Sequence, residues 1–429
     1  MHPEAADLNR IIEQANPAVM ELLSERGRNI YFPKRGILSQ SAEAKGKKIN
    51  ATIGTALEDD GSPLCLSTIA SKVSLPPAQI FPYAPSYGDP ALRAEWKKLL
   101  PVKNPTLAGK PVSLPVVTIA LTHGLSMLGY LFADEKTTII MPDLYWENYD
   151  LVFSNAYGAS FAQFPTFANG GFNVDGFVAA VKKSASKKKV ILLNFPNNPS
   201  GYSPTHDEAK KIVTIVNEAA AAGDSIVLIL DDAYFGLAFD DTVYPESLFS
   251  LTADLHERVL AVKVDGPTKE DYVWGFRVGF VTFGVKGGSD ALYGALADKL
   301  AGAIRGNVSN APMISQSLIL QSLQSPDYAA QKQEKFNTLK KRCTLVKKVL
   351  AEHPEYKDCF EQLPFNSGYF MCIKLRSADS EKVRQRLLTQ YSTGVIAFAG
   401  IIRVAFSATP TGKIEELFDN IYRACKDVG

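Results

Sequence analysis

The chain carries in its second half the stretch Val259-Leu-Ala-Val-Lys-Val264-Asp-Gly-Pro-Thr-Lys269-Glu-Asp-Tyr-Val-Trp-Gly-Phe-Arg277-Val-Gly-Phe-Val-Thr-Phe283. Its two ends, residues 259–264 and 278–283, are short apolar runs rich in Val, which is typical of buried strands. Between them lies a short segment that contains Lys269, eight residues before Arg277. The stretch therefore predicts two core strands joined by a short loop, with a lysine held at the end of the first strand.

A lysine in such a loop is placed to do chemistry. Its amine can form a Schiff base with an aldehyde cofactor, and desolvation lowers a lysine pKa from its usual value of ~10.4. Arg277 can hold a phosphate group. Most lysines in a chain of this kind are solvated surface residues, so this interpretation depends on other residues that suit the same cofactor.

Similar apolar runs extend on both sides of this stretch, and helix-length segments lie between them. A mostly parallel sheet covered by helices on both faces, an α/β fold, is predicted by that alternation. The expected strands are residues 116–121, 138–141, 190–193, 226–230, 259–264 and 278–283, and two of the intervening helices are residues 174–182 and 206–222.

The two ends of the chain have a different character. Residues 326–352 show a long charged helical pattern, and a strand at 369–375 and helices at 380–390 and 412–426 are expected after it. Residues 1–50 are polar, with one expected helix at 17–23. We expect a large domain over residues 65–325 and a smaller α+β domain made of residues 1–64 with residues 326–429.

Composition narrows the class of protein. The chain has 429 residues, with 46 Lys+Arg against 45 Asp+Glu, so no charge surplus favours nucleic acid or an anionic membrane as a partner. Five scattered cysteines without a CxxC pair disfavour a zinc site and suit a reducing compartment. No membrane-length apolar run or signal-peptide pattern is visible, so we expect a cytoplasmic enzyme without a metal.

Polar residues follow several of the expected strands. After residues 116–121, Thr122-His-Gly-Leu-Ser126 is expected to open a helix, and the backbone N–H groups of Gly124, Leu125 and Ser126 form a candidate phosphate seat. A plain strand-to-helix turn is the alternative interpretation.

Three further strand ends supply groups for a ring. Asp231 can pair with a ring nitrogen, and Tyr234 can offer its phenol to the same ligand, although a helix cap and a half-buried tyrosine are the alternative. Asn198 lies in a turn rich in proline, and Trp146 can stack on a flat ring or serve as a core aromatic. Since strand ends of one sheet meet at one edge, these groups together match pyridoxal 5′-phosphate.

With these residues the chain resembles the fold-type-I pyridoxal-phosphate aminotransferases of the aspartate and aromatic group, from about residue 50 to the end. Asn198-Pro-Ser-Gly201 is similar to the family's Asn-Pro-Thr-Gly turn, and Asp231-Asp-Ala-Tyr234 is similar to its Asp-x-x-Tyr. Lys269 and Arg277 keep the family spacing of the Schiff-base lysine and the phosphate arginine. The resemblance implies that Asp231 and Tyr234 serve the ring and that Lys269 is the base that moves the Cα proton.

The resemblance also implies substrate and dimer residues. Arg403 matches the arginine that binds the substrate α-carboxylate, and Gly54 lies in a segment similar to the substrate loop. Arg305 matches an arginine that crosses a homodimer interface to bind the distal carboxylate of aspartate or glutamate. Tyr83 resembles a tyrosine that reaches the phosphate held by the neighbouring subunit.

There are departures from the family pattern. Gly266 stands where a phosphate-binding serine is usual, so Thr268 or Ser126 is expected to take its role, and Tyr149 replaces a common histidine. The segment from Lys269 to Arg277 is charged and aromatic where relatives are often rich in glycine.

The expected reaction is a ping-pong transfer of the amino group from an L-amino acid, aspartate or aromatic or both, to a 2-oxo acid such as 2-oxoglutarate. A pyridoxal-phosphate lyase, either a C–S β-lyase or a decarboxylase, is the alternative on the same residues. Arg305 favours the transaminase, because two substrates of different shape need a distal carboxylate site. No GxGxxG or GxxxxGK[ST] follows an expected strand, which disfavours a nucleotide-binding enzyme.

Overall fold

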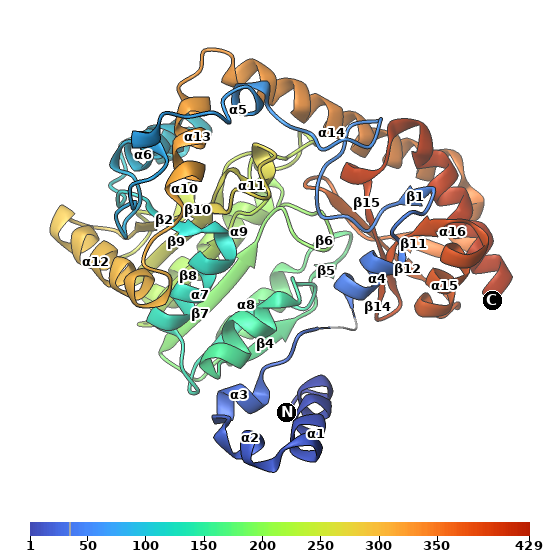
Figure 1. The fold of residues 1–429 in the computed structure, drawn as a ribbon, viewed down its shortest axis with the longest axis horizontal. Coiled ribbons are helices and arrows are strands. Elements are labelled where there is room, and N and C mark those ends of the chain that lie inside the picture. Colours follow the sequence, from blue (N-terminus) through green and yellow to red (C-terminus); the bar gives the residue numbers. More distant parts are fainter. Residues whose placement is uncertain (34–35) are drawn as a thin grey trace.

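A seven-stranded sheet forms the centre of the computed structural model, which describes residues 1–33 and 36–429 (Figure 1). The strand order is β2-β10-β9-β8-β7-β3-β4, and all neighbours are parallel except β10, which is antiparallel to both of its own. The strands are β2 (Val116–Ile119), β3 (Thr138–Pro142), β4 (Ser160–Phe164), β7 (Lys188–Asn194), β8 (Ser225–Asp231), β9 (Val259–Asp265) and β10 (Val278–Gly284). The predicted α/β fold is thereby confirmed.

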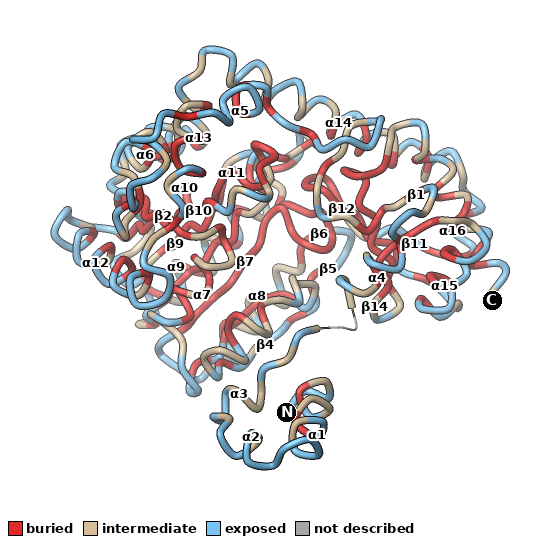
Figure 2. The backbone as a smooth tube through the Cα atoms, viewed as in Figure 1, coloured by how far each residue is buried: buried red, intermediate tan, exposed pale blue. Residues whose placement is uncertain are grey.

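Successive residues of the strands enter two different hydrophobic cores. On β7, Ile191 and Leu193 enter one core, whereas Val190 and Leu192 enter the other. A strand that is buried on both faces needs a continuous apolar run, and this is why the sequence pattern identified these strands. Figure 2 shows the sheet as a continuous buried band.

Helices cover both faces of this sheet. On one face lie α6 (Pro90–Lys103), α8 (Val174–Lys183), α9 (His206–Ala221), α10 (Leu248–Thr252) and α13 (Met313–Leu323), and on the other lie α7 (Ala120–Phe132) and α12 (Asp290–Asn307). Two further short helices are α5 (Ser67–Ala70) and α11 (Pro267–Glu270). The start of α9 is fixed by a capping box, in which Thr205 and Glu208 bind each other's backbone N–H groups. Minor elements are β5 (Phe167–Ala168), β6 (Gly171–Phe172), single 3-10 turns at Pro77–Gln79 and Pro105–Leu107, and a π-helical turn at Asp150–Asn155.

Two boundaries differ from expectation. The strand expected at 116–121 ends at Ile119, because Ala120 adopts a positive φ of 56° and turns the chain directly into α7. Lys269, which we expected in a loop, lies in the single helical turn α11. The edge strand β4 was not predicted, since its residues are half exposed and form no apolar run.

The C-terminal part forms a second, antiparallel sheet of order β11-β12-β15-β14. Its strands are β11 (Phe360–Gln362), β12 (Phe370–Leu375), β14 (Ile396–Phe398) and β15 (Ile401–Ala405), and its helices are α14 (Tyr328–Glu352), α15 (Ser380–Gln390) and α16 (Ile414–Val428). Short 3-10 turns lie at Pro354–Asp358, Phe406–Ala408 and Thr411–Lys413, and β13 (Thr393–Gly394) pairs with β1 (Ile49–Asn50). The elements expected near 326–352, 369–375, 380–390 and 412–426 are all present.

The N-terminal segment contains α1 (Pro3–Ala15), α2 (Pro17–Leu22), α3 (Glu25–Asn29) and α4 (Ile37–Glu43), although one helix was expected. The first three lie beside the large sheet, where the Asn155 amide donates to the Asn29 carbonyl at 2.8 Å. Helix α4 packs on the second sheet, where Gln40 bonds to the backbone of Ala397. Residues 1–64 thus contact both sheets, and the division at residues 65 and 325 stays a prediction.

Among the residues described, no helix is both long enough and apolar enough to cross a bilayer.

Candidate active site

A cavity of about 300 Å³ lies at the carboxyl ends of the parallel strands, between the two sheets and under α4. Ligands of open parallel sheets bind at this edge. Nine residues singled out from the sequence line it: Gly54, Trp146, Asn198, Asp231, Tyr234, Thr268, Lys269, Arg277 and Arg403.

Lys269 enters this cavity from α11, the turn that follows β9. Its Nζ lies 5.3 Å from the centre of the Tyr234 ring, and its backbone carbonyl accepts a 2.6 Å hydrogen bond from the Tyr369 hydroxyl. Burial lowers the pKa of Lys269 to about 8, with Arg277 acting in the same direction and Asp231 against it. About a tenth of the amine is therefore neutral at pH 7, far more than for an ordinary lysine, and the neutral form is what a nucleophile or general base requires.

Asp231 is the last residue of β8 and is almost fully buried. Its Oδ2 accepts a 2.5 Å hydrogen bond from the Tyr149 hydroxyl, and its Oδ1 accepts the Ala233 N–H at 3.1 Å. Burial raises the pKa of Asp231 to about 6, while the bond from Tyr149 opposes that rise. The carboxyl group is therefore mostly ionised at pH 7, and Tyr149, noted in the sequence as a departure, is its fixed donor.

The turn after β7 connects Asp231 to Arg403. The Asn194 side chain donates to the Asp231 carbonyl at 2.7 Å and accepts from the Asn198 N–H at 2.8 Å. The Asn198 side chain in turn accepts from Arg403 Nη1 at 3.2 Å. One hydrogen-bonded series thus places the acid, the amide and the arginine around the same space.

Arg403 is almost fully buried on β15 and still has unused donor capacity. Its Nη2 donates to the Thr52 carbonyl at 3.2 Å, and its guanidinium lies 4.3 Å from the Phe370 ring centre. Within the part of the chain that the structure describes, its Nε has no hydrogen-bond partner. A buried donor without a partner costs free energy. A bound carboxylate would satisfy this guanidinium, which agrees with the predicted substrate role.

The phosphate end of the cavity is built differently from the expectation. Because α7 begins at Ala120, the residues of its first turn that line the cavity are Ala120, Leu121 and Thr122. Gly124 and Leu125 are buried in the body of the helix, and Ser126 lies against the Tyr157 hydroxyl at 3.1 Å. The three predicted N–H groups lie beyond the start of the helix. Ala120 donates its N–H to the Arg277 carbonyl at 3.0 Å, so helix geometry leaves the N–H groups of Leu121 and Thr122 for a ligand at this end.

Two glycines allow backbone segments to lie unusually close together at the phosphate end of the cavity. A Cβ on Gly279 would lie 2.6 Å from the Ala120 carbonyl carbon, and a Cβ on Gly266 would lie 2.8 Å from the Val278 carbonyl oxygen. The serine usual at position 266 therefore has no room. Thr268 and Arg277 line the cavity, and the substitution of Thr268 for that serine stays a prediction.

Tyr83 and Arg305 do not reach the cavity in a single chain. Tyr83 is 91% exposed, and Arg305 is exposed in the last turn of α12. Both were predicted to act across a dimer interface, and they stay predictions.

Several cavity residues were missed in the sequence. They are Ile37, Leu38 and Ser41 of α4, together with Thr52 and Phe370. Helix α4 is only seven residues long and has no motif, so no local signal marked it. Phe370 had a signal, since it belongs to the predicted strand at 369–375 that pairs with the strand of Arg403.

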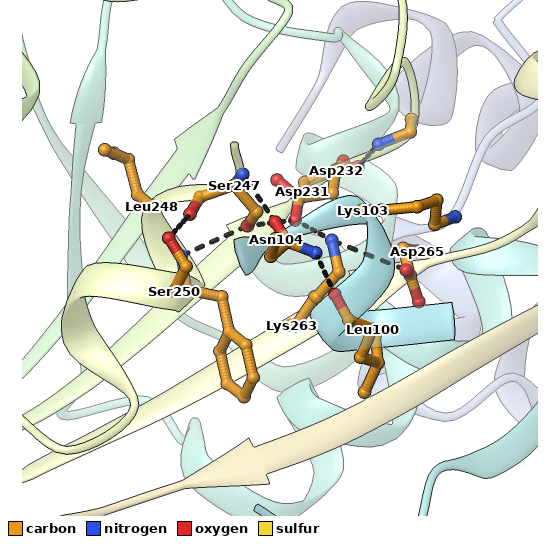
Figure 3. Close-up of polar contacts among 12 residues, drawn as sticks. Leu100, Lys103, Asn104, Asp231, Asp232, Ser247, Leu248, Ser250, Lys263 and Asp265 are labelled. Atoms are coloured by element: carbon orange, nitrogen blue, oxygen red, sulfur yellow. Dashed lines mark hydrogen bonds and ion pairs between the residues drawn. The ribbon is translucent and has the colours of Figure 1, made fainter. Parts of the chain in front are cut away.

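A polar cluster lies beneath Asp231, on the side away from the cavity (Figure 3). The neighbouring Asp232 points into the large core, where it forms ion pairs and hydrogen bonds with Lys263 and Ser247, and Lys263 also lies 3.4 Å from Asp265. The Ser247 N–H donates to Asn104 of the turn that follows α6. The Asp231 carboxylate therefore faces the cavity, whereas the Asp232 carboxylate binds Lys263 and so links the end of β8 to β9.

The donor set around the cavity fits pyridoxal phosphate. It offers an amine for an aldehyde, an ionised acid for a ring nitrogen, an indole for the ring face, and an arginine with a helix start for a phosphate. Among residues 1–33 and 36–429 no group of His, Cys, Asp and Glu side chains could hold a metal ion.

Comparison with known proteins gives a consistent result. The family model for aminotransferase class I and II matches residues 47–421. A probable aspartate/prephenate aminotransferase of Rickettsia felis is 28% identical, covering 72% of this chain and 75% of the relative. The cytoplasmic aspartate aminotransferase of Saccharomyces cerevisiae is 23% identical, covering 72% of this chain and 75% of its own length.

Solved structures agree in fold. An aminotransferase of Anaerococcus prevotii superposes with a TM-score of 0.82 at 22% identity, covering 94% of this chain and 98% of that one. The yeast cytoplasmic aspartate aminotransferase gives a TM-score of 0.76 at 18% identity, with coverage of 93% and 98%.

Proposed function

This chain belongs to the aminotransferase class I and II family, and we propose that it is a pyridoxal-phosphate enzyme that moves the amino group of an L-amino acid to a 2-oxo acid. The proposed donor is aspartate, an aromatic amino acid or both, the proposed acceptor is 2-oxoglutarate, and the proposed order is ping-pong. Relatives named as aspartate aminotransferases support aspartate as a donor, and a relative whose name adds prephenate, a 2-oxo acid, supports an acceptor of this class.

The observation that carries the proposal is one cavity that holds Lys269, Asp231 and Arg403 together. A partly neutral amine, an ionised acid and an arginine with an unused donor come from α11, β8 and β15. A proton transfer at the Cα of an amino acid requires these three groups on three sides of the substrate.

When bound, pyridoxal phosphate supplies an electron sink for the bond that breaks at Cα. Lys269 would hold its aldehyde carbon, Asp231 its ring nitrogen and Tyr234 its 3′ oxygen. Trp146 would lie on the ring face. Arg277, Thr268 and the first turn of α7 would hold its phosphate.

The chain's own residues then have defined tasks. Arg403 binds the substrate α-carboxylate, and Asn198 orients that arginine through its side-chain oxygen. The neutral Lys269 amine removes the proton from Cα and later returns a proton to the product. The Asp231 carboxylate stays ionised because Tyr149 donates to it, so it can keep a proton on the ring nitrogen.

The assembly is part of the proposal. We propose a cytoplasmic homodimer in which Tyr83 and Arg305 of each chain complete the site of the other. The exposure of both residues supports that arrangement. The five cysteines, none of which forms a disulfide in the structure, support a reducing compartment.

The test is a half-reaction followed by absorbance. The purified protein loaded with pyridoxal phosphate should show the visible band of the lysine-bound cofactor. Aspartate or tyrosine without an acceptor should bleach that band and release one equivalent of 2-oxo acid, and 2-oxoglutarate should restore it. A band that persists while ammonia, carbon dioxide or a thiol is released would identify a lyase, and no band at any cofactor concentration would refute the proposal.

Replacement of the central lysine gives the matching prediction. Lys269→Ala should lower kcat by at least about 10³-fold and abolish the visible band, because both the tether and the base are lost. Lys286→Ala, which changes an exposed lysine in the turn after β10, is the control and should behave as wild type. Turnover of Lys269→Ala near the control's value would remove Lys269 from the mechanism.

A further inference from the structure

Two acidic residues directly follow the proposed catalytic lysine, and the mechanism does not use them. Glu270 is 3% exposed and Asp271 is 1% exposed. Ionised carboxylates are rarely buried without partners, because removing them from water is costly. Their partners therefore show what these two residues do.

The partners come from two helices that lie far from residue 270 in the chain. Lys332 of α14 places its Nζ 2.5 Å from Glu270 Oε2 and 3.1 Å from Asp271 Oδ1. Lys103, the last residue of α6, lies 2.6 Å from Glu270 Oε1. The Tyr328 hydroxyl, one turn before Lys332, donates to Asp271 at 2.9 Å. The short helix α11 is thus held by ion pairs on the side away from the cavity.

The charges in this cluster balance. Burial raises the pKa of Glu270, but Lys103 and Lys332 outweigh burial and hold it at about 2. Burial raises the pKa of Asp271, and Lys332 opposes that rise. Two carboxylates therefore face two ammonium groups, and Lys332 contacts both carboxylates.

The same helix holds the substrate side of the cavity. Lys335 lies 2.9 Å from Glu58, and Arg342 lies 2.8 Å from Asp59, both in the loop that follows Gly54. Arg342 also donates to the Ser407 carbonyl at 2.5 Å, just beyond the strand that carries Arg403. Figure 1 shows α14 running from the large sheet across to the second one. One helix therefore contacts the lysine turn at one end and the carboxylate-binding elements further along.

We propose that Lys332 is a positioning residue. By holding Glu270 and Asp271, it fixes the Lys269 amine relative to Arg403, and α14 couples binding of the substrate carboxylate to proton transfer at Lys269. The inference depends on the proposed role of Lys269 as the base. It concerns the charged segment that directly follows Lys269.

The decisive variant is Lys332→Met, which keeps most of the side-chain volume and removes the charge. It should lower kcat roughly 10- to 100-fold, because a small displacement of the amine costs this much, while KM for aspartate changes little. Lys332→Arg should restore most of kcat. The double variant Lys332→Met with Asp271→Asn restores the charge balance of the cluster and should recover part of the lost kcat. Lys348→Met, at an exposed position of the same helix, is the matched control.

A second readout does not need the cofactor. Competitive acetylation of the cofactor-free protein over a pH series, followed by peptide mass spectrometry, reports the pKa of Lys269. Asp231 and Arg277 are the charged groups that act on Lys269 directly, and both are unchanged in every variant. Lys332→Met leaves one carboxylate of the cluster without a cation, and this negative charge should raise the pKa of Lys269. Neither Lys332→Arg nor Lys348→Met should change the pKa of Lys269.

The outcomes are distinct. A wild-type kcat and an unshifted Lys269 pKa in Lys332→Met would overturn the inference. A loss of kcat in Lys332→Arg as large as that in Lys332→Met would also overturn it. If Lys332→Met does not fold by circular dichroism, Tyr328→Phe, which removes one donor from Asp271, carries the same test with a smaller expected loss. A wild-type protein that does not transaminate would refute the proposed function, while the acetylation series still tests the position of Lys269.

Discussion

At the scale of single residues, environment separates chemically identical groups. Asp231 and Asp232 are neighbours, yet the first faces the cavity with Tyr149 as its donor and the second pairs with Lys263 in the core. Lys263 and Lys269 differ in the same way. Lys263 lies between two carboxylates, which raise its pKa against the effect of burial, whereas the pKa of Lys269 is lowered to about 8. Residue type suggested the chemistry, and the local charges decide which lysine can perform it.

The pKa of Lys269 predicts how cofactor binding depends on pH. Only the neutral amine attacks an aldehyde, and a pKa of about 8 lies below the usual lysine value. The neutral fraction therefore reaches about one half near pH 8 and is nearly complete about one pH unit higher. The association rate of pyridoxal phosphate with cofactor-free protein should therefore rise about tenfold per pH unit below that pKa and then level off.

Stopped-flow absorbance over a pH series measures this rate. The control is Nα-acetyl-lysine, whose side-chain amine is free. Its rate of reaction with pyridoxal phosphate should keep rising with pH up to the higher pKa of that amine. A protein curve that runs parallel to this control would contradict the lowered pKa.

At the scale of elements, the strands and long helices follow from the sequence, and the connections between them do not. The apolar runs at 190–193, 226–230 and 259–264 are all strands, since burial on both faces imposes a pattern that is visible locally. The start of α7 was misplaced, because it depends on the positive φ of Ala120 and on the space that Gly279 leaves opposite. A contact between residues 120 and 279 has no local signature.

This close approach can be tested with Gly279→Ala. A Cβ there would lie 2.6 Å from the Ala120 carbonyl carbon and 2.8 Å from the Leu121 nitrogen, so the first turn of α7 must move. We expect the free energy of unfolding to fall by about 1–3 kcal/mol, and we expect pyridoxal phosphate to bind more weakly.

Urea unfolding and cofactor titration measure these two effects. Gly294→Ala is the matched control, because nothing lies within 4 Å of a Cβ at this position in α12. It should stabilise the helix by roughly 0.5–1 kcal/mol. Equal stability and cofactor affinity in the two variants would show that the crowding at Gly279 is unimportant.

At the scale of the whole molecule, the cavity exists because two sheets meet. The large sheet supplies Asp231 and, through α11, Lys269, while the second sheet supplies Arg403 and Phe370. Helix α14 bridges the two parts, and α4 covers the cavity from the N-terminal segment. Tyr83 and Arg305 lie outside the cavity of their own chain, so the proposed complete site requires two chains.

A heterodimer tests this sharing of the site. Arg305→Ala alone should lower kcat/KM for aspartate by roughly 10²-fold, because a charge pair with the distal carboxylate is lost. In a purified heterodimer of one Lys269→Ala chain and one Arg305→Ala chain, one of the two sites has both residues intact. That heterodimer should recover about half of the wild-type turnover per dimer. If the turnover of the heterodimer is no higher than half that of the Arg305→Ala homodimer, Arg305 acts in the site of its own chain or in no site.

The sequence by itself determined the alternation of strands and helices, the family, and the residue types that meet at the strand ends. Nine of the residues it singled out line one cavity, and seven of these lie at strand ends of the large sheet that face the same edge. Gly54 and Arg403 come from other parts of the chain. Patterns of this kind are local, because the burial of a strand determines the types of consecutive residues along it.

Only the tertiary structure decided which groups touch. It set the pairing of Asp231 with Tyr149, the unused donor of Arg403, the start of α7 at Ala120, and the ion pairs of Lys332 behind Lys269. These contacts join residues separated by tens to hundreds of positions, and their energies depend on burial and distance. Neither quantity exists until the chain has folded.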